Sequence, residues 1–141
     1  MILPPNPAEA AFTDLLFVYG TLRRDFERHR ELERLGARFV AEGSIKGALF
    51  DLGPFPGARR TGPDARRVQG ELYRLPRISK ALFVLDQIEG FCPDSPDSSL
   101  FVRETTEVSL PNGERVSAWV YWLNHWKGPM RRIPSGDYRR G

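Results

Sequence analysis

The first long apolar run of this chain reads Leu15-Leu16-Phe17-Val18-Tyr19-Gly20-Thr21-Leu22. Five apolar residues in succession, ended by a glycine, are typical of a short strand that is buried on both faces. Glycine has no Cβ, so it tolerates the tight turns in which strands end. We therefore predict a buried strand over 15–19 and a turn over 19–22, and this turn is the first candidate site.

Several further segments have the composition of strands. The expected strands are 37–52, 68–75, 101–109 and 115–123. The first of these predicts one long bent strand, or two strands joined by a bulge, because Gly43 and Gly47 interrupt it. The last two are expected to form a hairpin through the turn sequence Pro111-Asn112-Gly113.

Two segments have the spacing of amphipathic helices. The first runs from Asp25 to about Leu35 and is followed by Gly36 as a C-terminal cap. The second is expected to begin at Ser79 as N-cap and to stop at Gly90. Loops are predicted for 54–57, for 92–99 and for the tail from residue 125 onward. Many short strands with two helices predict an α+β domain whose sheet is mixed or closes into a barrel.

Length and composition fit one globular domain. The chain has 141 residues, of which 40% are hydrophobic and 28% charged, enough to bury one core. Residues 1–13 are rich in proline and alanine and are predicted to be a loosely ordered leader before a single domain over 14–141. The single cysteine, Cys92, allows no intramolecular disulfide and no thiolate metal cluster, which favours the reducing cytoplasm. No apolar run is long enough for a membrane span.

The charge balance does not require an anionic polymer as partner. Lysine and arginine total 21 against 18 acidic residues, a formal charge of +3. We therefore expect no nucleic acid partner, although the arginines 131, 132, 139 and 140 leave a nucleic-acid or protein-binding role open beside a solvated tail. His29 and His125 stand alone without metal-ligand spacing, so no metal and no cofactor are predicted.

Four motifs, in order along the chain, resemble those of the γ-glutamylcyclotransferase-like family. They are Phe17-Val18-Tyr19-Gly20-Thr21-Leu22-Arg23, Val68-Gln69-Gly70-Glu71-Leu72-Tyr73, Leu85-Asp86-Gln87-Ile88-Glu89-Gly90 and Ala118-Trp119-Val120-Tyr121. The family includes γ-glutamylamine cyclotransferases and the AIG2-like plant proteins named for avirulence-induced expression. The resemblance spans roughly residues 15–138.

The resemblance implies a fold and a reaction. The fold is a small mixed β-barrel with two flanking helices and a cavity at one end. The reaction is the intramolecular cyclisation of a small γ-glutamyl amine or amide to 5-oxoproline, with release of the amine. It needs a general base, because the attacking α-amine is mostly an ammonium near neutral pH, and it needs a proton for the departing amine.

The resemblance assigns the catalytic role to Glu89. This residue is expected in the last turn of the second helix, beside the apolar residues Leu85, Ile88 and Phe91. Desolvation and the negative end of the helix dipole both raise the pKa of a carboxyl group in such a place. On the pattern alone, a solvated glutamate at a helix end is the more common outcome for such a residue, and it is the resemblance that favours the catalytic role.

The resemblance also assigns substrate binding to Tyr19, Gly20, Thr21 and Leu22. Backbone N–H groups of this turn would form a concave donor nest for the α-carboxylate, with Gly20 permitting close approach. A plain strand-ending turn is the competing interpretation. Tyr121 matches a pocket-lining tyrosine of the relatives, although a barrel-core aromatic fits the same pattern.

Three other positions carry weaker signals. Phe101 stands two residues before Arg103, where the relatives often have a tyrosine. Phenylalanine has no hydroxyl group, so any hydrogen bond made by the tyrosine of the relatives is lost here. Arg103 is still expected to pair with a carboxylate in the core. Cys92 has no evident His or Asn partner that would activate it as a nucleophile, so we interpret it as a cysteine in a loop without a catalytic role.

A non-catalytic binding module of the same fold is the alternative to an enzyme. The γ-glutamyl compound that serves as substrate depends on loops over the cavity, and oligomeric state has no signature in the sequence.

Overall fold

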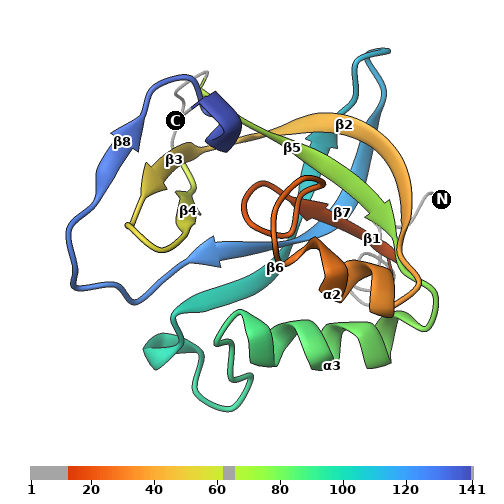
Figure 1. Cartoon of the computed structure of the whole chain (residues 1–141), viewed down its shortest axis with the longest axis horizontal. Helices are drawn as coiled ribbons and strands as arrows, with labels where there is room; N and C mark the ends of the chain where they lie inside the picture. Colours follow the sequence, from red (N-terminus) through yellow and green to blue (C-terminus); the bar gives the residue numbers. More distant parts are fainter. Residues whose placement is uncertain (1–12, 62–65, 141) are drawn as a thin grey trace, which may run out of the picture.

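Five strands close into a barrel, in the order β1-β5-β2-β6-β7, in a computed structural model that describes residues 13–61 and 66–140 (Figure 1). The strands are β1 (Leu15–Val18), β2 (Arg38–Lys46), β5 (Arg67–Arg74), β6 (Phe101–Ser109) and β7 (Arg115–Leu123). All neighbours pair antiparallel except β1 and β7, which run parallel where Leu16 meets Trp119. The predicted mixed barrel is therefore confirmed, as is the hairpin of β6 and β7.

Two glycines that pair across β2 and β5 allow the neighbouring strands of the barrel to approach closely. Gly43 is the partner of Gly70 in the antiparallel register. A Cβ on Gly70 would lie 2.3 Å from the carbonyl oxygen of Val18 and 2.5 Å from the Phe17 ring, so only glycine fits there. β2 also carries a register shift between Phe39 and Ala41, which lies before the two glycines at which a bulge was expected.

A second, three-stranded sheet was only partly predicted. It consists of β3 (Ala48–Asp51), β4 (Pro56–Arg59) and β8 (Arg131–Ile133), in the order β4-β3-β8. The segment 37–52 is thus two strands that belong to different sheets, separated at Gly47. The prediction of a loop at 54–57 was wrong at its end, because Pro56 and Gly57 pair with Asp51 and Phe50 despite their poor strand propensity.

The tail after residue 125 is also more regular than predicted. β8 pairs with β3, and its Ile133 is 2% exposed. A short 3₁₀ turn, η2 (Tyr138–Arg140), follows, and Tyr138 stacks on Phe26. Three residues are too few to show a strand period, so this strand becomes visible only through its partner. The loop predicted at 92–99 holds one more 3₁₀ turn, η1 (Pro96–Ser98).

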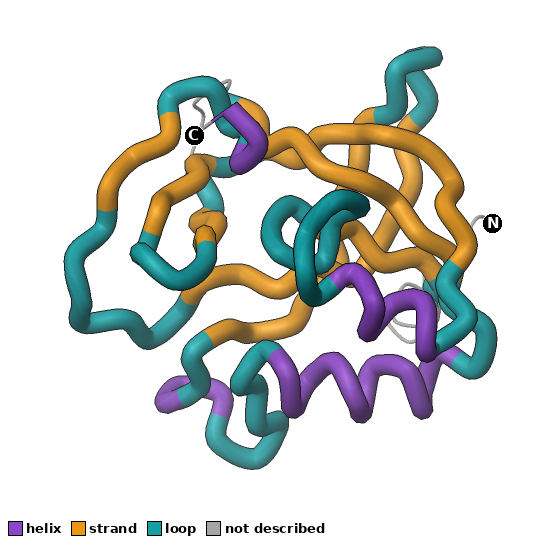
Figure 2. The backbone as a smooth tube through the Cα atoms, viewed as in Figure 1, coloured by secondary structure: helices purple, strands orange, loops and turns teal. Residues whose placement is uncertain are grey.

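Two helices lie along one flank of the barrel, α2 (His29–Arg34) and α3 (Ile78–Ile88) (Figures 1 and 2). α2 is shorter than predicted because residues 25–28 form turns rather than helix, and the first of them, Asp25, has a left-handed backbone conformation with φ 76°. The N-cap of α3 is Arg77 rather than Ser79, and it makes no side-chain capping bond. Gly36 and Gly90 follow the two helices with positive φ, as predicted. The helices of the described residues are all too short or too polar to cross a membrane.

β1 is buried on both faces, as its continuous apolar sequence predicts. Leu16 and Val18 pack in the core between the barrel and the helices, whereas Phe17 and Tyr19 pack in a second core shared with the small sheet. The turn after β1 therefore emerges where both cores meet. The predicted leader lies outside the described residues except for Thr13, whose hydroxyl donates to the carbonyl oxygen of Ser117 at 2.8 Å.

Candidate active site

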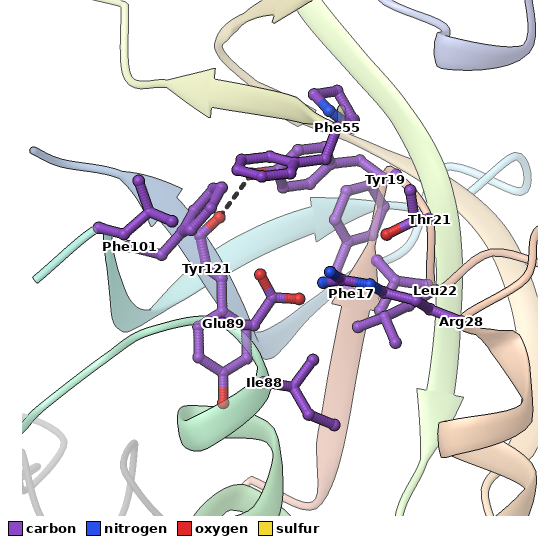
Figure 3. A pocket seen from close by; sticks show the side chains of 14 residues that line it. Phe17, Tyr19, Thr21, Leu22, Arg28, Phe55, Ile88, Glu89, Phe101 and Tyr121 are labelled. Atoms are coloured by element: carbon purple, nitrogen blue, oxygen red, sulfur yellow. Dashed lines mark hydrogen bonds between the residues drawn. The ribbon is translucent and has the colours of Figure 1, made fainter. Parts of the chain in front are cut away.

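A cavity of about 170 Å³ opens where β1, β7 and the end of α3 converge (Figure 3). It is lined by Phe17, Val18, Tyr19, Gly20, Thr21, Leu22, Arg28, Phe55, Pro56, Ile88, Glu89, Leu100, Phe101 and Tyr121. All six residues that the sequence suggested for catalysis or binding are in this set. Three segments separated by up to about a hundred residues contribute them, so the fold brings three of the four motifs into one site, and the lining includes no residue of 68–73.

Glu89 is the acidic residue of this lining, and α3 places it. It is the C-cap of the helix, its backbone N–H donates to the carbonyl oxygen of Leu85 at 2.9 Å, and the left-handed Gly90 turns the chain away immediately afterwards. The side chain consequently points into the cavity rather than along the helix surface (Figure 3).

Burial raises the pKa of Glu89 from 4.5 to about 7, and the positive charge of Arg28 opposes part of that rise. The carboxyl group is surrounded by protein, while the residue keeps a partly open surface toward the cavity. A carboxyl group with this pKa exchanges protons readily near neutral pH and is accessible to a molecule in the cavity.

The turn after β1 presents backbone donors to the same cavity. The carbonyl oxygen of Gly20 accepts from the N–H of Arg23 at 3.0 Å, which closes the turn. In the part of the chain that the structure describes, the N–H groups of Thr21 and Leu22 have no protein acceptor. The space above Gly20 is taken by the ring of Pro56, since a Cβ on the glycine would lie 2.7 Å from Pro56 Cγ.

A buried carboxylate supports this turn from behind, and it was missed by sequence reasoning. Glu71 is fully buried in β5 and accepts hydrogen bonds from the Arg24 N–H at 2.9 Å, the Tyr73 hydroxyl at 2.9 Å and Arg139 Nη2 at 2.8 Å. A carboxylate that is buried within a strand needs cationic or hydrogen-bonding partners, because an unpaired buried charge is very unfavourable. The position of Glu71 in a predicted strand was therefore the sequence signal that could have pointed to such partners.

The C-terminal arginines are held within the chain. Arg131 pairs with Asp51, Arg139 with Glu71, and Arg140 Nε lies 3.9 Å from Asp137 Oδ2. Asp137 in turn accepts from Arg23 Nη1 at 2.8 Å. The interpretation of this segment as a solvated tail was therefore wrong at Arg139, whose side chain reaches a fully buried carboxylate.

The two tyrosines of the cavity have engaged hydroxyl groups. The Tyr121 hydroxyl donates to Asp86 Oδ1 at 2.7 Å, so it points away from the cavity and only its ring forms part of the wall (Figure 3). The Tyr19 hydroxyl donates to the Tyr121 carbonyl oxygen at 2.7 Å and accepts from the Ala58 N–H at 3.1 Å. Burial holds the pKa of both phenols far above their usual range, so both remain neutral.

Arg103 pairs with a carboxylate, as the sequence suggested, and that carboxylate is Asp86. Its Nε and Nη2 atoms lie 2.7 Å and 3.1 Å from the two oxygens, a bidentate arrangement. Phe101, which stands where the relatives often have a tyrosine, is buried and lines the cavity. Its ring lies next to that of Phe55, so this part of the wall is apolar. Cys92 is exposed in a loop and is not part of the lining.

Arg28 is the cationic residue of the lining that the sequence did not single out. It precedes α2 within a run of arginines and glutamates, where nothing in the spacing separates a pocket residue from a surface residue. Across residues 13–61 and 66–140, no three His, Cys, Asp or Glu side chains are grouped so that they could hold a metal ion.

Comparison with known proteins agrees with this architecture. The family model described as "Gamma-glutamyl cyclotransferase, AIG2-like" matches residues 16–140. A protein of Vibrio cholerae that carries the provisional name gamma-glutamylcyclotransferase is 32% identical over 124 residues, which cover 88% of this chain and 94% of that protein.

Solved structures share the fold. YkqA from Bacillus subtilis superposes with a TM-score of 0.69 at 27% identity, covering 92% of this chain and 40% of YkqA. This chain therefore corresponds to less than half of YkqA. An AIG2-like protein of mouse superposes with a TM-score of 0.65 at 22% identity, covering 81% of this chain and 79% of the mouse chain. The chain belongs to the AIG2-like gamma-glutamyl cyclotransferase family.

Proposed function

We propose that this protein is a γ-glutamylcyclotransferase that converts a γ-glutamyl amine or amide into 5-oxoproline and releases the amine. One observation carries the proposal. A carboxyl group with a pKa of about 7 shares a small cavity with a turn that has two unpaired backbone N–H groups. The first feature suits proton transfer near neutral pH, and the second suits a bound carboxylate.

Ring closure begins with proton removal. Ionised Glu89 takes one proton from the α-ammonium of the substrate, and the nitrogen lone pair then attacks the γ-carbonyl carbon. This forms the new C–N bond and moves the carbonyl electron pair onto oxygen. The ring nitrogen now carries two hydrogens and a positive charge, and Glu89 is protonated.

Collapse of this intermediate returns the proton. Protonated Glu89 donates to the leaving nitrogen, the carbonyl re-forms, and the bond to the leaving nitrogen breaks. Glu89 then takes the second proton from the ring nitrogen and passes it to the released amine, which departs as an ammonium. One group thus moves both protons, which is possible because its pKa allows either protonation state near pH 7.

The turn orients the substrate for this attack. We assign the α-carboxylate to the N–H groups of Thr21 and Leu22, which would hold the α-carbon near Glu89 on the same cavity wall. A flexible glutamyl chain must otherwise find the folded conformation by itself, so anchoring one end offsets much of that entropy cost. The aromatic walls formed by Phe55, Phe101 and Tyr121 restrict access of water.

The test is incubation of the purified protein with a panel of γ-glutamyl amides, with 5-oxoproline followed by mass spectrometry. The panel should include γ-glutamyl amino acids, γ-glutamyl-ε-lysine and γ-glutamyl derivatives of simple amines. Formation of 5-oxoproline from at least one member is expected. Thermal stabilisation by these compounds without product from any of them would favour the binding module instead.

A further inference from the structure

A second buried carboxylate lies on α3, three positions before Glu89. Asp86 is 7% exposed and accepts three hydrogen bonds. Arg103 Nε and the Tyr121 hydroxyl each donate to its Oδ1 at 2.7 Å, and Arg103 Nη2 donates to its Oδ2 at 3.1 Å. Asp86 does not line the cavity, so any effect that it has on the reaction must pass through other residues.

The partners of Asp86 belong to the β6–β7 hairpin. Arg103 on β6 and Tyr121 on β7 are paired in register, so their side chains point to the same face of the hairpin and meet the same carboxylate. The guanidinium carbon of Arg103 also lies 4.6 Å from the centroid of the Trp119 ring and 5.7 Å from that of Phe91. These contacts hold the planar fork of the arginine toward Asp86.

The end of α3 that carries Glu89 is fixed through Asp86. The carbonyl oxygen of Asp86 accepts the backbone N–H of Phe91 at 2.8 Å, which closes the turn around Glu89 and the left-handed Gly90. Residues three positions apart lie on one face of a helix, so Asp86 and Glu89 face the hairpin side together. The contacts of Asp86 with Arg103 therefore restrict how far Glu89 can rotate or move away from the cavity.

Tyr121 connects this helix end to the turn after β1. Its hydroxyl donates to Asp86, its ring lines the cavity together with Glu89, and its backbone carbonyl oxygen accepts the Tyr19 hydroxyl at 2.7 Å (Figure 3). Tyr19 begins the turn that we assign to the substrate carboxylate. The proton-transferring group and the binding turn are thus connected through Tyr121 and Asp86.

We propose that Asp86 and Arg103 are positioning residues whose ion pair holds the Glu89 carboxyl at the reacting atoms of the substrate. This inference rests on the proposed function, in which Glu89 moves the protons. Arg103 supplies two of the three hydrogen bonds to Asp86, and Tyr121 supplies one. The ion pair is therefore the main connection between the helix end and the hairpin. A misplacement of about 1 Å in a catalytic group can slow a reaction by about 10²-fold.

The double variant Asp86→Asn/Arg103→Gln separates position from charge. It removes one negative and one positive side chain, so the net charge near Glu89 does not change. Each single variant leaves one unpaired charge, and because the two charges are opposite, their direct effects on Glu89 have opposite signs. A displaced helix end acts in the same direction in all three variants, because it brings water to the Glu89 carboxyl and moves that carboxyl away from the substrate.

The double variant should lower kcat on an accepted γ-glutamyl amide by about 10- to 100-fold, with KM within about 3-fold of the wild type because the turn is untouched. Both single variants should lower kcat as well. Burial raises the pKa of Glu89 to about 7. In the double variant, its titration, followed by carbon-13 NMR, should move down by at least about one pH unit. The other charged or titratable side chains of the lining, Arg28, Tyr19 and Tyr121, are retained.

Arg67→Gln is the matched control. Arg67 also makes three hydrogen bonds through Nε and Nη2, to Ser44 and Ser109, and it does not line the cavity. This variant should lose stability in urea unfolding but keep kcat and the carboxyl titration of the wild type. Arg103→Lys keeps the positive charge without the bidentate geometry, so its kcat should lie between those of Arg103→Gln and the wild type.

Where product forms, kcat is decisive. A double variant that loses stability but keeps kcat within about 3-fold of the wild type would overturn the inference, because the ion pair would then only stabilise the fold. If the double variant does not fold, a wild-type kcat in Arg103→Lys overturns it instead. If the wild type forms no 5-oxoproline from any γ-glutamyl amide, the proposed function fails. The Glu89 titration then decides the inference: a lower midpoint in the double variant supports it, and an unchanged midpoint overturns it.

Discussion

Arg139 Nη2 lies 2.8 Å from Glu71 Oε2, and the other oxygen of Glu71 accepts the backbone N–H of Arg24 at 2.9 Å. The same Arg139 atom also donates to the carbonyl oxygen of Arg24 at 3.1 Å. The third residue from the C-terminus is thereby connected, through one fully buried carboxylate, to the turn that we assign to substrate binding. The position of that turn depends on residues about a hundred positions later in the sequence.

We expect Arg139→Gln to lower stability and weaken substrate binding. Removal of one charged partner from a buried carboxylate costs about 1–3 kcal/mol here, since Arg23 and Arg24 remain near Glu71. KM should rise more than kcat falls, because Glu89 is not touched. Urea unfolding and steady-state kinetics measure the two effects, with the exposed Arg140→Gln as control. Unchanged stability and KM would show that the ion pair does not hold the turn.

Tyr121→Phe should leave activity nearly unchanged. Its hydroxyl is occupied by Asp86 and faces away from the cavity, so the mutation retains the ring that forms the wall. Asp86 keeps its bidentate pairing with Arg103, and a stability loss of about 1 kcal/mol is expected. The measurement is kcat/KM against thermal unfolding. A loss in kcat/KM of more than about 10-fold would mean that the hydroxyl acts on the substrate.

Substitutions in the turn should separate backbone from side-chain binding. Gly20→Ala places a Cβ 2.7 Å from Pro56 Cγ, so the turn or β4 must shift and KM should rise by at least about 10-fold. Thr21→Val removes a hydroxyl but leaves every backbone N–H in place, and KM should change by less than about 3-fold. The opposite order of effects would indicate that the Thr21 hydroxyl, and not the backbone, holds the carboxylate.

The parts of the fold with their own local pattern could be predicted from the sequence. The strand 15–19 has no polar residue, and the structure indeed buries β1 on both faces. The hairpin 101–109 and 115–123 has alternation and a turn signal, and its strands have these bounds. β4 and β8 are stabilised by their partners in the small sheet rather than by their own residues, so no local period marked them.

The candidate site shows the same division. Glu89 and the turn were found because they lie in motifs that resemble the family. Arg28, Glu71 and Arg139 were not found, because their importance arises from contacts between distant segments. Glu71 belongs to one of those motifs, yet its role appears only when the cations around it are seen.

The pKa of Glu89 predicts how stability depends on pH. An acid whose pKa is raised from 4.5 to about 7 in the folded protein stabilises the fold fully only below its unfolded pKa. That contribution is lost as pH rises through about 7, by roughly 3 kcal/mol at most. Glu89→Gln does not titrate there. The stability of this variant relative to wild type should therefore increase between pH 4.5 and pH 8, as measured by urea unfolding. A constant difference across this range would contradict the raised pKa.

The rate of 5-oxoproline formation by Glu89→Gln tests the central claim most directly. The amide keeps the size of the side chain but can neither accept nor return the proton, so kcat should fall by about 10²- to 10⁴-fold. Binding of the γ-glutamyl substrate, followed by calorimetry, and the circular dichroism spectrum should remain close to those of the wild type. A variant that turns over an accepted γ-glutamyl substrate within about 10-fold of the wild-type kcat would contradict the role of Glu89 as the proton-transferring group.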